Sequence, residues 1–368
     1  MKKKRLTCLL LTLLLTAAAL QGCAQAPQQQ EPQGPDYGLY ESDYGFLTLK
    51  NDEERAIYNG IGEAIENMEP EFVFTSDQAH YENRIYNIYC RWYRDHPICF
   101  WVKMESTKVF ENPSQGDAHE YQLTFFYTER DKDTVARQRS ELNDRLDALH
   151  AEADGLTDSE KVRFFYDYLC KYVVYTDELR WDQSCYNSLV KNKGVCSGYA
   201  SALQALCLRE GIPALQVFGR ERLPHGADPG DNHIWNMVQL EENWYYLDPT
   251  FGRKREDRPV NYEYYLRSHA EINKDHEVDQ SFCEYPKAPM DGEPATLKLE
   301  DYSLAQVEDY LRSRPEGENH MILQFAFEED FAAAEADLAS IKEAAKASVG
   351  RDISTYSHPY TKRIQLSW

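Results

Sequence analysis

The sequence predicts an α+β protein in which a helix that begins near a cysteine packs on an antiparallel sheet, with small α/β units on either side. Two observations carry this prediction. Residues 197–210 have the apolar spacing of an amphipathic helix. Three runs rich in β-branched and aromatic residues follow at 214–219, 232–240 and 243–247, and short turns separate the last two.

The first residues have the features of an export signal. Residues 1–5 are basic, and residues 6–20 are apolar over about the length of a secretory signal, too short to span a bilayer comfortably. Leu20-Gln-Gly-Cys23 resembles a bacterial lipobox, which implies cleavage after residue 22 and lipidation of Cys23. An ordinary signal peptide is the alternative. We therefore expect an extracytoplasmic protein, anchored in the membrane by lipid or, if the lipobox is not used, secreted.

Residues 23–39 are rich in Gln and Pro and cannot bury enough apolar surface to fold, so we expect a disordered tether.

The formal net charge is −22. Removal of residues 1–22 takes four basic and no acidic side chains, which leaves 36 basic against 62 acidic groups and a charge of −26. So acidic a chain argues against nucleic acid as a partner and against direct adhesion to anionic lipid. Membrane contact is expected through the lipid anchor.

Residues 40–155 are predicted to form an N-terminal α/β domain. Asn51 or Asp52 can cap a first helix, and Ser76 a second helix that Pro97 ends. The remaining elements are strands at 72–74, 98–102 and 121–127 and a long helix at 132–152. The many aromatic residues are interpreted as core, with a carbohydrate- or peptide-binding face as the alternative.

A cysteine, a histidine and an aspartate follow one another in settings that suit a catalytic triad. Cys196 precedes the 197–210 helix, whose N-terminus favours a thiolate. His233 lies in a strand-like run, and Asp248 follows the next run and precedes Pro249. In this arrangement Cys196 is the nucleophile, His233 the base that holds its proton, and Asp248 the residue that orients the imidazole.

Residues next to the cysteine are candidates for substrate binding. Gly194 and Gly198 have no side chain, so they leave room for an acyl group. The backbone N–H groups of Cys196 and Ser197 are candidate oxyanion donors. Trp235 is expected to pack against the triad, where it is also a candidate for substrate contact.

Three sequence blocks together resemble the transglutaminase-like cysteine superfamily. They are Gly194-Val-Cys-Ser-Gly-Tyr-Ala200, His233-Ile-Trp-Asn-Met-Val238 and Trp244-Tyr-Tyr-Leu-Asp-Pro-Thr250. The resemblance implies a papain/transglutaminase-like core over residues 156–270, with Cys196, His233 and Asp248 as triad. Cross-linking members usually carry Gln-Cys-Trp at the nucleophile, whereas this chain has Val-Cys-Ser. The resemblance is therefore to the bacterial protease-like members.

Several residues around this core have more than one interpretation. Thr157-Asp-Ser-Glu160 forms a capping box that opens a helix, which in the family packs beside the nucleophile helix. Tyr175, Trp181 and Tyr186 either line an acyl pocket or are buried aromatics. His225 lies in a turn-rich segment, so His233 is the better candidate base.

The C-terminal part carries no chemical motif. Residues 271–295 are predicted to be a linker, because they include a stretch with several Pro and Gly residues. Residues 296–368 are predicted as a small α/β unit with a structural or partner-binding role. Its expected elements are a helix capped by Ser303, a strand at 321–327, a helical face carrying Phe331, Leu338, Ile341 and Ala345, and a last strand at 364–368.

The cysteines leave the disulfide pattern open. The six cysteines other than 8, 23 and 196 could pair in 15 ways, and export permits disulfides. No Cys-x-x-Cys or His-x-x-x-His spacing indicates zinc, so neither a metal nor a cofactor is expected.

The primary functional hypothesis is a membrane-anchored thiol enzyme that cleaves or transfers amide bonds through a thioester. Its expected partner is a protein or peptide substrate, for example a cell-wall peptide. Three alternatives stay open: a catalytically silent surface scaffold or binding protein, a protein cross-linking transglutaminase, and a different acyl transfer such as arylamine acetyl transfer or glycan-amide cleavage.

Overall fold

The computed structural model describes residues 42–112, 118–176, 183–222, 229–255, 258–281, 284–292, 296–314 and 319–368. The predicted signal peptide, the lipidation residue Cys23, the tether, Trp181 and His225 lie outside these ranges. Within them, no helix combines the length and the apolar character needed to cross a membrane.

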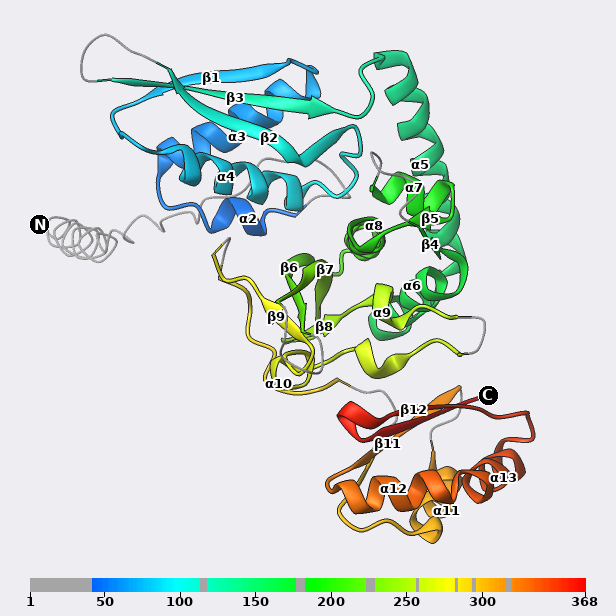
Figure 1. The fold of residues 1–368 in the computed structure, drawn as a ribbon. Helices are drawn as coiled ribbons and strands as arrows, with labels where there is room; N and C mark the ends of the chain where they lie inside the picture. The colour runs from blue at the N-terminus through cyan, green and yellow to red at the C-terminus, as the bar shows by residue number, and fades with distance from the viewer. Residues whose placement is uncertain are drawn as a thin grey trace, which may run out of the picture. The chain divides into compact units, whose positions relative to one another are not determined.

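The N-terminal part is a three-stranded antiparallel sheet of order β1-β3-β2 with helices α3 and α4 against it (Figure 1). Asn51 caps α3 as predicted, accepting a hydrogen bond from the backbone of Glu54. The elements of this part are α2 (Tyr44–Leu47), α3 (Asp52–Glu66), β1 (Glu71–Ser76), α4 (Glu82–Asp95), β2 (Val102–Asn112), β3 (His119–Tyr127) and α5 (Lys132–Glu152).

Two local predictions in this part are wrong. Ser76 ends strand β1 and does not cap α4, which begins six residues later at Glu82. Residues 98–101 form turns, and the strand predicted there begins only at Val102. Ser76 instead pairs with His119 on β3, and its hydroxyl accepts a hydrogen bond from the backbone N–H of Gln78.

The central part contains the predicted helix-on-sheet core. An antiparallel sheet of order β8-β7-β6-β9 packs against helix α8, whose neighbours on its other sides include α6 and α7. The elements are α6 (Asp158–Tyr172), β4 (Val174–Tyr175), α7 (Cys185–Val190), β5 (Lys193–Gly194), α8 (Cys196–Arg209), β6 (Ala214–Arg222), β7 (Pro229–Leu240), β8 (Asn243–Leu247), α9 (Pro249–Gly252), η1 (Tyr262–Tyr264), α10 (His269–Ile272) and β9 (His276–Val278). The α+β fold class is confirmed.

Most local predictions for the central part are confirmed. The capping box at Thr157 and Glu160 is present at the start of α6. Helix α8 begins at Cys196, and its N-cap Val195 is extended, so the chain turns from β5 directly into the helix. The turn between β7 and β8 places Glu241 at a φ of 54°, which gives the tight reversal that the sequence predicted.

Strand β9 was not predicted, because it lies in the segment expected to be a linker. It pairs with β6 in an antiparallel register that sets Val278 opposite Gly219. Gly219 also lies opposite His233 on β7. A Cβ atom at Gly219 would collide with the carbonyl oxygen of Glu277 and would lie 2.6 Å from the Trp235 side chain. Glycine at this position therefore allows β9 to approach the sheet.

The C-terminal part is a four-stranded mixed sheet of order β10-β11-β13-β12 with a core of its own. Its elements are β10 (Thr296–Leu299), α11 (Leu304–Ser313), β11 (His320–Phe325), α12 (Glu328–Ala336), α13 (Leu338–Val349), β12 (Ser354–His358), η2 (Pro359–Thr361) and β13 (Arg363–Ser367). Ser303 caps α11 as predicted. The expected single helical face is split between α12 and α13 at Asp337, whose carboxylate accepts a hydrogen bond from the Tyr302 hydroxyl.

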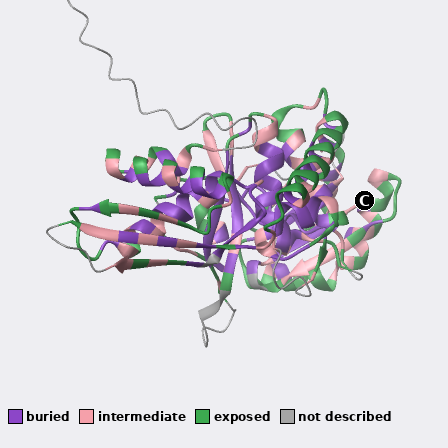
Figure 2. Cartoon of the chain, turned by 90° about the horizontal axis from the view of Figure 1, so that it is seen from above, coloured by how far each residue is buried: buried purple, intermediate pink, exposed green. Residues whose placement is uncertain are grey.

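The predicted boundary near residue 155 does not separate two hydrophobic cores. One continuous cluster contains buried residues of the N-terminal part and of α6, α7 and α8. Figure 2 shows this buried interior in purple, with exposed residues on the outer faces of the helices. Trp92, Tyr121 and Leu203 are among its buried members. The proposed domain limits therefore remain predictions.

Replacing Gly219 with alanine is expected to destabilise the fold by about 1–3 kcal/mol, because the new methyl group collides with β9 and Trp235. Alanine in an unstrained strand position would instead stabilise slightly by restricting the unfolded chain. Urea unfolding measures the difference, with Arg220→Ala at the exposed neighbouring position of β6 as control. An unchanged or increased free energy of unfolding for Gly219→Ala would contradict the close pairing of β9 with β6.

Candidate active site

Cys196 occupies the first position of α8 and remains partly exposed. Cys90, Cys170 and Cys207 are buried, and none of these four cysteines forms a disulfide. The first backbone N–H groups of a helix have no intrahelical partner, and they favour negative charge beside them. Cys196 therefore combines access to solvent with a position at the N-terminus of a helix.

The glycines beside Cys196 have a packing role in the structure. A Cβ atom at Gly194 or Gly198 would lie 2.5 Å from the hydroxyl oxygen of Ser188 on α7. Their absent side chains thus let α7 approach the turn from β5 into α8. Contact of either glycine with a substrate remains a prediction.

Ser197 is partly exposed and lies beside a small cavity. Its hydroxyl donates to the backbone oxygen of Gln183 at 3.0 Å. Ser197, Phe100, Gln216 and Ile234 line this cavity of about 30 Å³. Ser197 directly follows Cys196 in the sequence. Residues of both the N-terminal and the central part line the cavity.

His233 and Asp248 are brought together by adjacent strands. His233 lies on β7, and Asp248 follows β8 as the N-cap of α9. The Nε2 atom of His233 is 2.6 Å from Oδ2 of Asp248. The other oxygen, Oδ1, accepts the backbone N–H groups of Thr250 at 2.7 Å and Phe251 at 3.1 Å. Both carboxylate oxygens of this fully buried residue are therefore held.

The electrostatics of the pair favour a charged imidazole. Burial opposes the charge on His233, but the Asp248 carboxylate and hydrogen bonding to Cys196 outweigh it and raise the pKa of His233 to about 10. Burial likewise opposes the charge on Asp248, while His233 and a second histidine hold the pKa of this carboxyl well below its usual range. Because Nε2 of His233 is engaged by Asp248, Nδ1 is the nitrogen available to Cys196.

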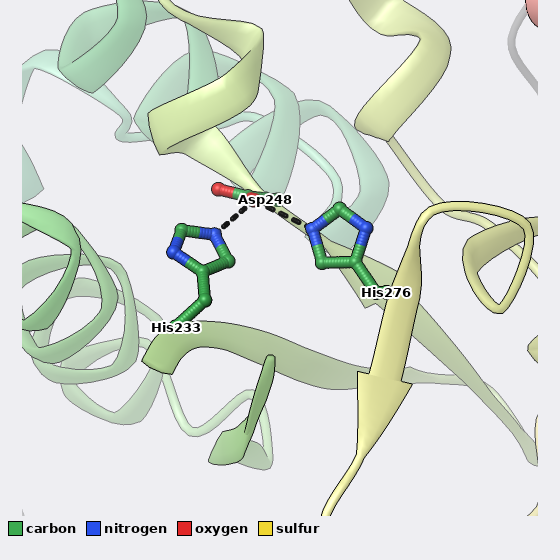
Figure 3. Close-up of side chains that lie close together, drawn as sticks. All are labelled: His233, Asp248 and His276. Atoms are coloured by element: carbon green, nitrogen blue, oxygen red, sulfur yellow. Dashed lines mark hydrogen bonds and ion pairs between the residues drawn. The ribbon is translucent and has the colours of Figure 1, made fainter. Parts of the chain in front are cut away.

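The second histidine is His276 on β9, which lies in the segment predicted to be a linker. Its Nε2 lies 3.0 Å from Oδ2 of Asp248, and its Nδ1 lies 2.6 Å from Oδ1 of Asp275. Figure 3 shows the Asp248 carboxylate between the rings of His233 and His276. The strand alternates from the buried His276 to the exposed Glu277 and the half-buried Val278, and three residues are too few for such a pattern to identify a strand from sequence.

Aromatic side chains enclose the two imidazoles. Trp235 is fully buried, stacks on His233 at 5.7 Å between ring centroids, and meets His276 edge-on at 4.8 Å. Phe251 lies 4.9 Å from His233 and 5.0 Å from His276. The expectation that Trp235 packs against the triad residues agrees with this position, while its contact with a substrate remains a prediction.

Two candidates for the acyl pocket lie in different settings. Tyr175 is 44% exposed and its ring faces the Arg253 guanidinium at 4.5 Å. Tyr186 is buried and stacks on Phe100 at 5.0 Å. The first could meet a ligand from solvent, whereas the second belongs to the core.

The cluster of His233, Asp248 and His276 has a composition that zinc accepts, and its ligand atoms lie within 4.8 Å of one another. Two ligands bound to zinc at about 2.0–2.1 Å with tetrahedral angles would be about 3.3 Å apart. The two nitrogens instead lie 2.6 and 3.0 Å from one carboxylate oxygen, which are hydrogen-bond distances. We therefore interpret the cluster as a hydrogen-bonded network.

Comparisons with known proteins match the central part of the chain. Residues 147–249 match the model of the transglutaminase-like superfamily. The mouse and human kyphoscoliosis peptidases are each 27% identical over 170 residues, which cover 41% of this chain. The chain therefore matches only 25% of the length of either relative.

Two solved structures are similar to this chain with low TM-scores. A TGase structure is 14% identical with a TM-score of 0.27, covering 40% of this chain and 46% of that one. The periplasmic domain of TgpA from Pseudomonas aeruginosa is 19% identical with a TM-score of 0.24, covering 50% and 73%. Scores this low carry no argument about the site. Residues 147–249 are therefore similar to the transglutaminase-like superfamily, and Cys196, His233 and Asp248 all fall within the matched range.

Proposed function

We propose that this protein is a thiol hydrolase or acyltransferase acting on amide bonds, with Cys196, His233 and Asp248 as its catalytic triad. The observation that carries the proposal is the position of His233. Its imidazole is held by the buried Asp248 on one side and interacts on the other with Cys196, which is accessible at the start of α8. A thiolate beside an oriented imidazolium is the activated form of a cysteine nucleophile.

The reaction follows from this arrangement. The Cys196 thiolate attacks the carbonyl carbon of an amide, and the first N–H groups of α8 are placed to stabilise the oxyanion that forms. The His233 imidazolium donates its proton to the leaving amine, which leaves a thioester on Cys196. The neutral imidazole then takes a proton from water or from an acceptor amine, whose attack releases the acyl group and restores the pair.

Hydrolysis of peptides is favoured over cross-linking. The residues flanking the nucleophile are Val195 and Ser197, which depart from the Gln-Cys-Trp pattern of cross-linking relatives. The similarity to two peptidases over the central part supports the same choice. A protein or peptide of the cell exterior, such as a cell-wall peptide, fits the proposed export and lipid anchoring at Cys23.

A silent scaffold is the competing function. It would have no need for an accessible cysteine beside a strongly basic imidazole, whereas a hydrolase depends on both. Reactivity of the thiol separates the two: a scaffold's Cys196 should react with a small electrophile at pH 6 no faster than free cysteine, whereas an activated thiolate should react faster.

Replacing Cys196 with serine is expected to lower the rate of amide cleavage at least about 10³-fold, because serine is a far weaker nucleophile in a site built for a thiolate. Mass spectrometry of a peptide pool incubated with the purified protein would measure cleavage and amine transfer together. Cys207→Ala, on the same helix but buried in the core, is the matched control and should retain activity. Cleavage by Cys196→Ser at the wild-type rate would refute the proposal.

The imidazole of His233 is expected to titrate near pH 10, which is the value to which Asp248 and Cys196 raise its pKa. Because the folded pKa exceeds the unfolded value of about 6.5, the stabilisation is complete below about pH 6.5 and is lost as the pH rises through about 10. Cleavage should decline over the alkaline end of the same range, since the leaving amine then lacks its proton donor.

Histidine side-chain NMR across the pH range measures this titration directly. Asp248→Asn should move the midpoint for His233 toward the value of a free imidazole, because the opposing carboxylate charge is lost. A midpoint near pH 6.5 in the wild-type protein would show that Asp248 does not hold His233 in solution.

A further inference from the structure

His276 is enclosed by two carboxylates within the core of the sheet. Its ring is fully buried, and each ring nitrogen lies at hydrogen-bond distance from a carboxylate oxygen, Nε2 from Asp248 and Nδ1 from Asp275. An ionised carboxylate only accepts hydrogen bonds, so each ring nitrogen must carry the proton that it shares. A histidine that donates from both nitrogens is an imidazolium cation.

Both carboxylates also accept hydrogen bonds from other donors. The backbone N–H groups of Thr250 and Phe251 donate to Oδ1 of Asp248. The Tyr264 hydroxyl, whose pKa is raised well above its ordinary value chiefly by burial, donates to Oδ2 of Asp275 at 2.6 Å. Both acids therefore act as acceptors toward other donors, and the same acceptor role toward the His276 ring fits the geometry.

Other groups also face His276, and Glu221 on β6 lies directly opposite it in the strand register. Trp235 and His233 face it from β7, Phe251 from α9 and Tyr264 from η1, with ring centroids 4.8 to 5.6 Å away. Among the described residues named by these contacts, the ionisable neighbours are His233, Tyr264, Asp248 and Asp275. Burial lowers the pKa of His276, but the two carboxylates outweigh it and raise the pKa overall.

We propose that His276 is a positioning residue of the active site: a buried, permanently charged imidazolium that fixes the Asp248 carboxylate and limits how strongly Asp248 retains the proton on His233. The inference rests on the proposed function for its catalytic meaning. The sharing of one Asp248 oxygen by His276 and His233 can be tested without measuring catalysis.

The sharing of Oδ2 has a direct consequence for His233. The two imidazole rings lie 5.4 Å apart between centroids, so a charge on His276 opposes a charge on His233. With Asp248 to itself, His233 would hold its proton more tightly and release it more reluctantly to a leaving amine. A general acid works best when its pKa is close to the working pH, and His276 shifts His233 in that direction.

The test uses full-length protein with Cys196→Ala as background. That change removes the contribution of Cys196 to the raised pKa of His233, and so brings the titration toward pH values at which the fold persists. Side-chain ¹H–¹⁵N NMR should show both nitrogens of His276 protonated from pH 6 to 9. His276→Gln and Asp275→Asn, each made in this background, should raise the titration midpoint of His233 by about one pH unit or more.

The variants separate a charge effect from a structural one. Asp275→Asn keeps the ring of His276 and an acceptor oxygen but removes the carboxylate charge that favours its second proton, so it tests the charge even if His276→Gln fails to fold. Glu277→Gln is the matched control, because it removes a carboxylate from an exposed position of the same strand and should leave the midpoint unchanged. Unfolding midpoints of all variants report stability separately.

Two outcomes would overturn the inference. One is a single unprotonated nitrogen on His276 at pH 7. The other is a His233 midpoint that stays unchanged or falls in the folded variants, even if their unfolding midpoints drop, because a merely structural role would move stability alone. If the wild-type protein cleaves peptides and either result is found, the proposed function stands and the inference fails. If the NMR results hold but no peptide is cleaved, the network is real and the proposed function fails.

Discussion

The buried carboxylate of Asp248 is the constraint on which the arrangement of the site depends. A carboxylate removed from water is costly unless charged or polar groups replace its hydration. Here two imidazoles and two backbone N–H groups do so, and they come from β7, β9 and the first turn of α9. The orientation of His233 toward Cys196 is therefore tied to the correct placement of three separate elements.

The sheet order explains how these elements meet. Strands β7 and β9 both pair with β6, and Gly219 on β6 lies opposite His233 on one side and Val278 on the other. Because Gly219 lacks a side chain, the backbone of β9 can lie against β6 and carry His276 to Asp248. Packing of Trp235 and Phe251 then excludes water from the two imidazoles, which strengthens each electrostatic interaction among them.

Cys196 differs from its partners in exposure, and the difference matches the chemistry proposed for each. His233 and Asp248 are buried, where a low dielectric maintains their coupling, whereas Cys196 is partly exposed at the end of a helix, where a substrate can reach it. The match to the transglutaminase-like superfamily spans residues 147–249, a range that contains Cys196, His233 and Asp248.

The sequence by itself determined the helix that begins at Cys196, the capping box of α6, the strands β6 to β8 and the identity of the three candidate residues. Each of these depends on local spacing, capping chemistry or a contiguous motif. Only the tertiary structure decided that Gly194 and Gly198 accommodate Ser188, that residues 276–278 complete the sheet, and that His276 shares Asp248 with His233. The physical reason is that a three-residue strand has too little periodicity to identify, and its position is set by strand pairing and by the charge of a carboxylate 28 residues away in the chain.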